Sequence, residues 1–209
     1  MIDSWLSKTK FKEGYEKFVK KVFLGKISAN QLTILGLVFG LVSSFLICLS
    51  GIFLALAITF MIYSVIVMTI SFFIDTLDGS IARLEGPTIF GGILDIFCDR
   101  LVEISIIIAI VTTDPTNLIW SGLFSLAAIV LCISMFLIVG GIIKKENIGS
   151  NSKVITYQSG LMERSETFFF LLALIVLIPW RLIILWIFTT LVFLTALLRL
   201  RDAHKVFKP

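Results

Sequence analysis

The stretch "DTLDGSIARLEGPTIFGGILDIFCDR", residues 75–100, places four aspartates inside a chain that is otherwise strongly apolar. Charged side chains seldom occur in apolar surroundings, because each must be removed from water at a large cost in free energy. Gly86 and Pro87 lie in the middle of the stretch, and such a pair predicts a break between two helices. The stretch therefore predicts two helices that meet at a turn, with acidic side chains on both.

The spacing of the aspartates puts each pair on one face of its helix. Asp75 and Asp78 lie three residues apart, and Asp95 and Asp99 lie four apart. Residues at these separations are neighbours on a helix, so the two pairs can converge where antiparallel helices meet. Small residues share these faces and leave room for a ligand or a facing helix. They are Gly79, Ala82, Gly91 and Gly92.

Four carboxylates that converge in a partly dehydrated site require a cation, because like charges oppose one another's ionisation. Arg83 and Arg100 can supply part of the compensation, and Glu103 is placed to orient Arg100. Oxygen ligands without histidine or thiolate suit Mg²⁺, Mn²⁺ or Ca²⁺, and two such ions can bind a diphosphate. The residues alone leave three interpretations open: metal-dependent phosphate chemistry, cation transport, or an Asp-Arg network that holds helices together.

The composition identifies the class of protein. The chain has 209 residues, of which 58% are hydrophobic and 15% are charged, and its mean hydropathy is +1.05. A transmembrane helix needs about 20 mostly apolar residues. We therefore predict an all-α integral membrane protein whose membrane domain, 27–201, contains six transmembrane helices. The predicted spans are 29–50, 52–74, 90–112, 118–142, 167–180 and 182–198.

The ends of the chain and its positive charges predict the orientation. Residues 1–26 place apolar side chains at helical spacing among lysines, which predicts an amphipathic helix at the membrane interface. Residues 202–209 form a polar tail. With six spans both termini share a side, on which 17 of the 18 basic residues fall, and only Arg181 lies opposite. The positive-inside rule makes that side, with the aspartates, cytoplasmic.

Several other classes of function lack support in the sequence. Cys48, Cys98 and Cys132 lie in apolar runs without C-x-x-C spacing, so we expect small buried hydrophobic side chains. His204 is the only histidine, and no Ser-His-Asp or Cys-His system can be assembled. The net charge of +4 fits contact with anionic membrane lipid. Nucleic acid is not an expected partner, because the sequence has no motif that binds it.

The aspartates belong to a longer pattern. The chain reads Asp75-x2-Asp78-Gly79-x2-Ala82-Arg83-x7-Gly91-x3-Asp95-x3-Asp99. This run resembles the signature of the CDP-alcohol phosphatidyltransferases at every fixed position. The stretch "ANQLTILGL" at 29–37 also resembles the first-helix pattern of that family, with Ala29 where proline is common.

The resemblance implies a reaction and a cofactor. Members of the family transfer a phosphatidyl-type group from a CDP-linked lipid, such as CDP-diacylglycerol or CDP-archaeol, to a hydroxyl of a small polar alcohol and release CMP. The implied cofactor is Mg²⁺ or Mn²⁺, two ions per chain, and the implied general base on the acceptor is Asp99. The implied metal ligands are Asp75, Asp78, Asp95 and Asp99. The implied CDP contacts are Asn30, Thr33, Asp78, Gly79, Ala82, Arg83 and Gly91.

The acceptor alcohol is predicted from basic residues. Lys153, Arg164 and Arg199 are candidates for contact with an anionic acceptor, since arginine binds phosphate bidentately. Positive-inside anchoring accounts for the same residues. The stretch "GLMERSE" at 160–166 resembles one found in members that use inositol phosphates. We therefore predict an inositol phosphate as the acceptor, with serine and glycerol 3-phosphate as alternatives.

Two other functions share some of these features. UbiA-type prenyltransferases also surround Mg²⁺ and a diphosphate with Asp-rich motifs, but they carry more helices and two separate motifs. A cation transporter would also use intramembrane acids, but the Asp-bearing segment has no internal repeat here. The resemblance also implies a homodimer in the plasma membrane of a prokaryote. Gly36 and Gly40 permit close helix packing, either within one chain or between two.

Overall fold

The computed structural model describes residues 27–86, 88–145, 162 and 164–206. Within these ranges the chain is helical and contains no strand. Two short 3-10 helices, η1 (Leu54–Leu56) and η2 (Ile178–Trp180), precede α4 and α8. The α-helices are α3 (Ala29–Ile52), α4 (Ala57–Glu85), α5 (Ile89–Thr113), α6 (Pro115–Lys145), α7 (Arg164–Val176) and α8 (Arg181–Val206). The amphipathic helix predicted at 1–26 lies outside the described residues.

Four segments of the described chain are long and apolar enough to cross a membrane, so the chain is a multi-pass membrane protein. They are Ala29–Ile52, Leu54–Glu85, Pro115–Ile142 and Ile178–Lys205. α5 carries four acidic or basic side chains between Asp95 and Glu103, and α7 has only 13 residues, or about 20 Å of helix. A helix occurs at each of the six predicted positions, but the count of six spans stays a prediction.

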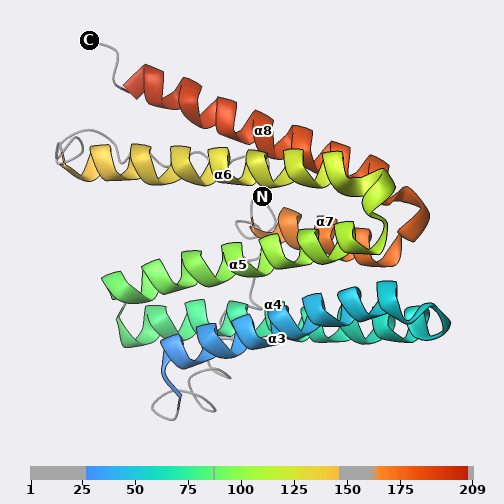
Figure 1. The fold of residues 1–209 in the computed structure, drawn as a ribbon. Coiled ribbons are helices and arrows are strands. Elements are labelled where there is room, and N and C mark those ends of the chain that lie inside the picture. Colours follow the sequence, from blue (N-terminus) through green and yellow to red (C-terminus); the bar gives the residue numbers. More distant parts are fainter. Residues whose placement is uncertain (1–26, 87, 146–161, 163, 207–209) are drawn as a thin grey trace, which may run out of the picture.

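The helices form two groups that α7 joins (Figure 1). α3, α4 and α5 pack against one another, and α6 packs along α8. α7 lies between the groups, in contact with α4, α5 and α8. The main buried cluster is apolar and draws residues from both groups. Its fully buried members include Ile47, Ile106, Ile110, Leu174 and Phe188.

Small residues let α3 approach its two neighbours closely. The hydroxyl of Ser71 on α4 donates a hydrogen bond of 2.7 Å to the backbone oxygen of Gly36. A Cβ added to Gly40 would lie 2.4 Å from a methyl carbon of Val102 on α5, so only glycine fits at that position. Both glycines predicted to permit close packing therefore serve contacts within one chain.

The turn between α4 and α5 brings the acidic segments together. α4 ends at Glu85, and Gly86 follows with a φ of 100°, a conformation that glycine adopts without strain. Thr88 then caps α5, since its hydroxyl accepts a hydrogen bond of 3.0 Å from the backbone N–H of Gly91. The predicted break inside the aspartate stretch is confirmed.

Arg181 closes the opposite end of the bundle. Its side chain is buried, and Nε donates a hydrogen bond of 2.8 Å to the backbone oxygen of Leu174 at the end of α7. Nη1 donates a bond of 2.9 Å to the hydroxyl of Thr113 at the end of α5. Because the last carbonyls of a helix carry partial negative charge, the guanidinium stabilises the end of the short helix α7 and ties it to α5.

Candidate active site

Three of the four aspartates converge between α4 and α5. One carboxylate oxygen from each of Asp75, Asp95 and Asp99 lies within 4.8 Å of the other two, and all three residues are half-buried. Asp75 comes from α4, whereas Asp95 and Asp99 lie one helical turn apart on α5. The three carboxylates converge for two reasons. Helical spacing puts Asp95 and Asp99 on one face of α5, and the turn after α4 brings that face against α4. Oxygen atoms grouped in this way can share a hard divalent cation.

Asp78 lies beside this group in a more buried position. Its side chain is 3% exposed, and its Oδ2 atom is buried without a hydrogen-bond partner in the described part of the chain. The hydroxyl of Thr33 lies within hydrogen-bonding reach of the carboxylate. A buried hydrogen-bond acceptor without a partner lowers the stability of the folded protein. The position of Oδ2 is therefore consistent with a carboxylate that binds a cation or a ligand.

A cavity of about 300 Å³ opens next to Asp78 and Asp95. Six of the residues implied as CDP contacts line it, namely Asn30, Thr33, Asp78, Gly79, Ala82 and Gly91. Arg83 does not line the cavity; it is exposed, and its Nη2 donates a hydrogen bond of 3.1 Å to the hydroxyl of Ser80. Ser28, Glu85 and Thr88 also line the cavity. Glu85 and Thr88 occupy variable positions inside the motif and Ser28 precedes α3, so their type and spacing did not distinguish them from other polar residues.

The wall of this cavity is tightly packed at Gly91. A Cβ added there would lie 2.8 Å from the hydroxyl oxygen of Thr88 and 3.1 Å from Oδ1 of Asn30. The neighbouring Gly92 has no atom within 4 Å of such a Cβ. A side chain at residue 91 would therefore displace both the helix cap and Asn30, whereas residue 92 has free space.

A second, smaller cavity of about 70 Å³ touches Asp75 and Asp99. Glu103 and Thr167 also line it, among residues that are mainly apolar. Because the larger cavity touches Asp78 and Asp95 instead, the aspartate group stands between two cavities of different character. Small and polar residues line the larger one, whereas large apolar side chains such as Leu37 and Phe72 line the smaller one.

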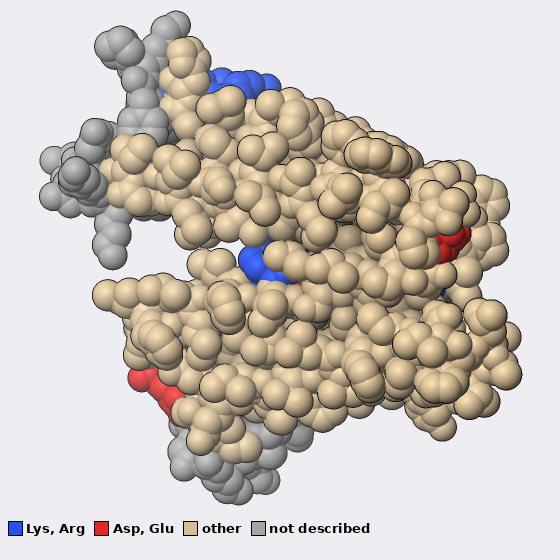
Figure 2. Space-filling view, in the orientation of Figure 1, with Lys and Arg blue, Asp and Glu red and all other residues tan. Residues whose placement is uncertain are grey.

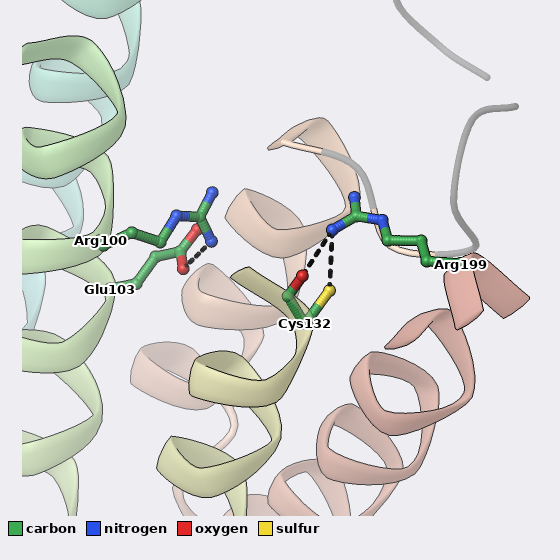
Figure 3. A network of polar contacts seen from close by, with 4 residues as sticks. All are labelled: Arg100, Glu103, Cys132 and Arg199. Atoms are coloured by element: carbon green, nitrogen blue, oxygen red, sulfur yellow. Dashed lines mark hydrogen bonds and ion pairs between the residues drawn. The ribbon is translucent and has the colours of Figure 1, made fainter. Parts of the chain in front are cut away.

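Two sets of polar contacts, one within α5 and one between α6 and α8, form the polar network drawn in Figure 3. Arg100 donates a hydrogen bond to the buried carboxylate of Glu103, as the sequence predicted. Nη1 of Arg199 donates to the backbone oxygen of Cys132 at 2.9 Å and to its sulfur at 3.1 Å. Figure 3 shows Arg100 and Arg199 extending toward each other, with Cys132 between them.

The surface near this network is hollowed. Figure 2 shows a hollow between the N-terminal part of α5 and the C-terminal part of α6, with basic side chains at its inner end. Of the residues predicted to contact the acceptor, Arg199 lies in the network. Lys153 lies outside the described residues, and Arg164 begins α7 but its side chain is not described.

Comparison with known proteins decides the class of enzyme. The model of the CDP-alcohol phosphatidyltransferase family matches residues 26–197, which is most of the chain. The chain belongs to this family. The match confirms the family predicted from the aspartate motif and favours a transferase over the two alternatives, a UbiA-type prenyltransferase and a cation transporter.

A relative with a similar sequence also fits this family. The archaetidylinositol phosphate synthase of Pyrococcus horikoshii is 34% identical over 102 residues, which cover 48% of this chain and 50% of that protein. The chain therefore matches about half the length of this relative.

Solved structures of the phosphatidylinositol phosphate synthase of Mycobacterium tuberculosis share the fold. The structure with CDP-DAG bound has a TM-score of 0.66 and 17% identity, and the match covers 93% of this chain and 96% of that one. The structure in complex with manganese and citrate has a TM-score of 0.65 and 18% identity, with 94% and 91% covered. At such low sequence identity, these matches show only that this transferase has the same fold.

Proposed function

We propose that this transferase moves a phosphatidyl-type group from a CDP-linked lipid, either CDP-diacylglycerol or CDP-archaeol, to a hydroxyl of an inositol phosphate and releases CMP. The observation that carries the proposal is the convergence of Asp75, Asp95 and Asp99 beside a polar cavity that Asp78 lines. Carboxylates in this arrangement suit a diphosphate that is bound through divalent metal, and the family motif supplies the nucleotide contacts around them.

The four aspartates are suitable ligands for Mg²⁺ or Mn²⁺. All four groups are carboxylates, no thiolate or imidazole joins them among the described residues, and the buried Oδ2 of Asp78 has no protein partner. Two ions bound by Asp75, Asp78, Asp95 and Asp99 would neutralise the diphosphate and the departing CMP. The manganese in the structure of the M. tuberculosis synthase supports this choice of metal.

The 300 Å³ cavity is the proposed site of the CDP group. Asn30 and Thr33 of α3 face the small residues of α4 and α5 across it, so a flat base or a ribose can approach the backbone closely. Gly79, Ala82 and Gly91 keep that space open. For Arg83 to contact CDP, its exposed side chain would turn from Ser80 toward the nucleotide.

Asp99 is the proposed general base. Its carboxylate accepts the proton of the acceptor hydroxyl while the hydroxyl oxygen forms a bond to the lipid-bearing phosphorus. The bond between that phosphorus and the bridging oxygen of the diphosphate breaks, and its electron pair leaves with CMP. Asp99 suits this role because it borders the second cavity, away from the proposed nucleotide site.

An inositol phosphate is the proposed acceptor for two reasons. The relatives compared above are named as archaetidylinositol phosphate and phosphatidylinositol phosphate synthases. Arg199 also places a cation in the polar network beside Cys132, with Arg164 and Lys153 as further candidates. Serine and glycerol 3-phosphate remain the alternative acceptors, and serine would not require these cations.

The proposed topology has six spans, with both termini and the aspartates on the cytoplasmic side of a prokaryotic plasma membrane. The short α7 and the acid-bearing α5 are the fifth and third of these spans. The distribution of basic residues supports the orientation. The family resemblance supports a homodimer, and the lipid tails of the donor would remain in the cytoplasmic leaflet.

The test is CMP release by the purified full-length protein in lipid. Each CDP-lipid is combined with Mg²⁺ or Mn²⁺ and with one acceptor at a time: inositol 1-phosphate, glycerol 3-phosphate, serine or free inositol. The proposal expects release only with metal and inositol 1-phosphate. Release with serine alone would refute the acceptor but keep the transferase, and no release from protein that binds metal and CDP-lipid would refute the proposed acceptor and its alternatives.

A further inference from the structure

A third cavity lies at the end of the bundle away from the aspartates. Its volume is about 370 Å³. The connections α3–α4, α5–α6 and α7–α8 and the helix ends beside them form it, and Figure 1 shows these connections at the opposite end from the α4–α5 turn. Met61 lines the cavity and precedes Asp78 by 17 residues on α4, or about 25 Å of helix. The cavity is therefore separate from the candidate active site.

Arg181 brings a buried positive charge to this cavity. Its side chain lines the cavity and is 5% exposed, and the ion pairs of the described residues do not include it. Besides the bonds to Leu174 and Thr113, its Nη2 lies 3.4 Å from the sulfur of Met61 and 3.4 Å from the backbone oxygen of Ile175. A thioether is a weak acceptor, and 3.4 Å is long for an N–H···O bond. Only neutral groups thus surround a charge whose burial is costly without an anion.

Asp114 does not neutralise this charge by direct contact. It lines the same cavity and lies within electrostatic range of Arg181. Its carboxylate, however, accepts hydrogen bonds from the side-chain amide of Asn117 at 2.8 and 3.1 Å and from the backbone N–H of Asn117 at 3.3 Å. Asp114 therefore serves as the cap of α6, and the donors of Arg181 that face the cavity remain open to a ligand.

Exposed apolar side chains border the cavity. Leu54 is 80% exposed, Ile178 and Leu182 are also exposed, and all three line the cavity. Trp180, next to Arg181 in the sequence, is exposed as well, and tryptophan is typical of the membrane–water interface. A ligand can therefore place a charged group against Arg181 and keep apolar chains on the surrounding surface.

We infer that this cavity binds the phosphodiester of a phospholipid from the leaflet away from the aspartates, with Arg181 as the cation that contacts the phosphate. One arginine matches the single negative charge of a phosphodiester, whereas Asp114 would repel a free phosphate dianion. Positive-inside anchoring does not explain Arg181, because it is the one basic residue that the predicted topology puts on this side. The inference is independent of the proposed acceptor.

Lipid binding to the full-length protein, purified in detergent and stripped of lipid, tests the inference. The probes are dioleoylphosphatidylglycerol, dioleoylglycerol, which has the same chains without phosphate, and inorganic phosphate. Native mass spectrometry counts the bound lipids. The rise of Tm with lipid concentration gives a Kd, since a ligand that binds only the folded state stabilises it.

Four variants separate this cavity from the candidate active site, which also accepts phospholipid. Ala57→Leu narrows the cavity that Ala57 lines and leaves every hydrogen bond of Arg181 in place. Ala55→Leu is the matched control, because Ala55 is exposed and does not line the cavity. Asp114→Asn removes a negative charge and keeps the helix cap, since asparagine caps as well as aspartate. Arg181→Gln removes the cation.

The native protein should gain Tm with phosphatidylglycerol and not with dioleoylglycerol or inorganic phosphate. Ala57→Leu should raise the Kd for phosphatidylglycerol about tenfold and bind one lipid fewer per chain, whereas Ala55→Leu should match the native protein. Asp114→Asn should lower the Kd about two- to fivefold, because one like charge near the phosphate is gone. Phosphatidylglycerol should not raise the Tm of Arg181→Gln.

The same Kd and lipid count in Ala57→Leu and native protein would overturn the proposed site. An equal rise of Tm with dioleoylglycerol would overturn the role of the phosphate. A rise with inorganic phosphate that lipid does not increase further would assign the cavity to a free anion and overturn the lipid. Weaker binding by Asp114→Asn would contradict Arg181 as the charge that recognises the ligand. CMP release is measured separately, so the failure of either proposal leaves the other standing.

Discussion

Replacing Gly40 by alanine should push α3 and α5 apart. The new Cβ would lie 2.4 Å and 2.7 Å from the two methyl carbons of Val102 and 3.1 Å from its Cβ. Rotation of the valine gives no relief, because valine in a helix has one strongly preferred χ1 and both methyl groups are already too close. The two helix backbones must therefore separate.

The size of the effect follows from two opposing contributions. Overpacking of a well-packed core costs about 1–3 kcal/mol, whereas alanine in place of glycine within a helix gains about 0.5–1 kcal/mol. The net loss of unfolding free energy is thus about 0–2.5 kcal/mol, or a fall in Tm of up to about 10 °C for a chain of this size. Activity should fall as well, since Val102 lies between Asp99 and Glu103 on α5.

Thermal unfolding of the purified protein in one detergent measures the effect. Gly36→Ala is the matched control on the same helix, because its Cβ would lie 3.6 Å from the backbone oxygen of Ser71, an ordinary contact. Its Tm should equal or exceed that of the native protein. The double variant Gly40→Ala/Val102→Ala should recover most of the loss. Equal Tm values for the Gly40 and Gly36 variants would refute the reasoning.

Four further outcomes are expected. Asp99→Asn should lower kcat by about 100-fold or more and retain CDP-lipid binding in a direct binding assay. Asp78→Asn should lose the metal dependence of nucleotide binding, measured by titration with and without Mn²⁺. Gly91→Ala should raise the KM for CDP-lipid, because its Cβ would lie 2.8 Å from the helix-cap hydroxyl. Arg181→Gln should lower Tm by thermal unfolding, since buried carbonyls that lose their donor cost about 1–3 kcal/mol each.

The family and the aspartate motif could be predicted from the sequence, because both depend on residues that are close together in the chain. Helical spacing puts Asp95 and Asp99 on one face whatever surrounds them, and Gly86 marks the turn because few other residues adopt its positive φ. The apolar stretches likewise predict membrane helices from length alone. The ion pair between Arg100 and Glu103 is of the same kind, since the two residues are three positions apart.

The grouping of the aspartates was not predictable in this way. The sequence treats Asp75 and Asp78 as equivalent members of one face, but the packed helices place Asp75 with Asp95 and Asp99 and bury Asp78 beside the larger cavity. The rotation of α4 about its axis makes this difference, and it is fixed by contacts such as Ser71 with α3.

The sequence by itself determined that this protein is a helical membrane transferase with an acidic site at one turn, because periodicity, hydropathy and motif spacing are properties of neighbouring residues. Only the tertiary structure decided that Gly40 packs on Val102 within one chain, that Arg83 is exposed, and that α8 carries Arg199 back toward α5 and α6. Such contacts join residues far apart in the chain. They depend on how helices rotate and pack, which local spacing does not specify.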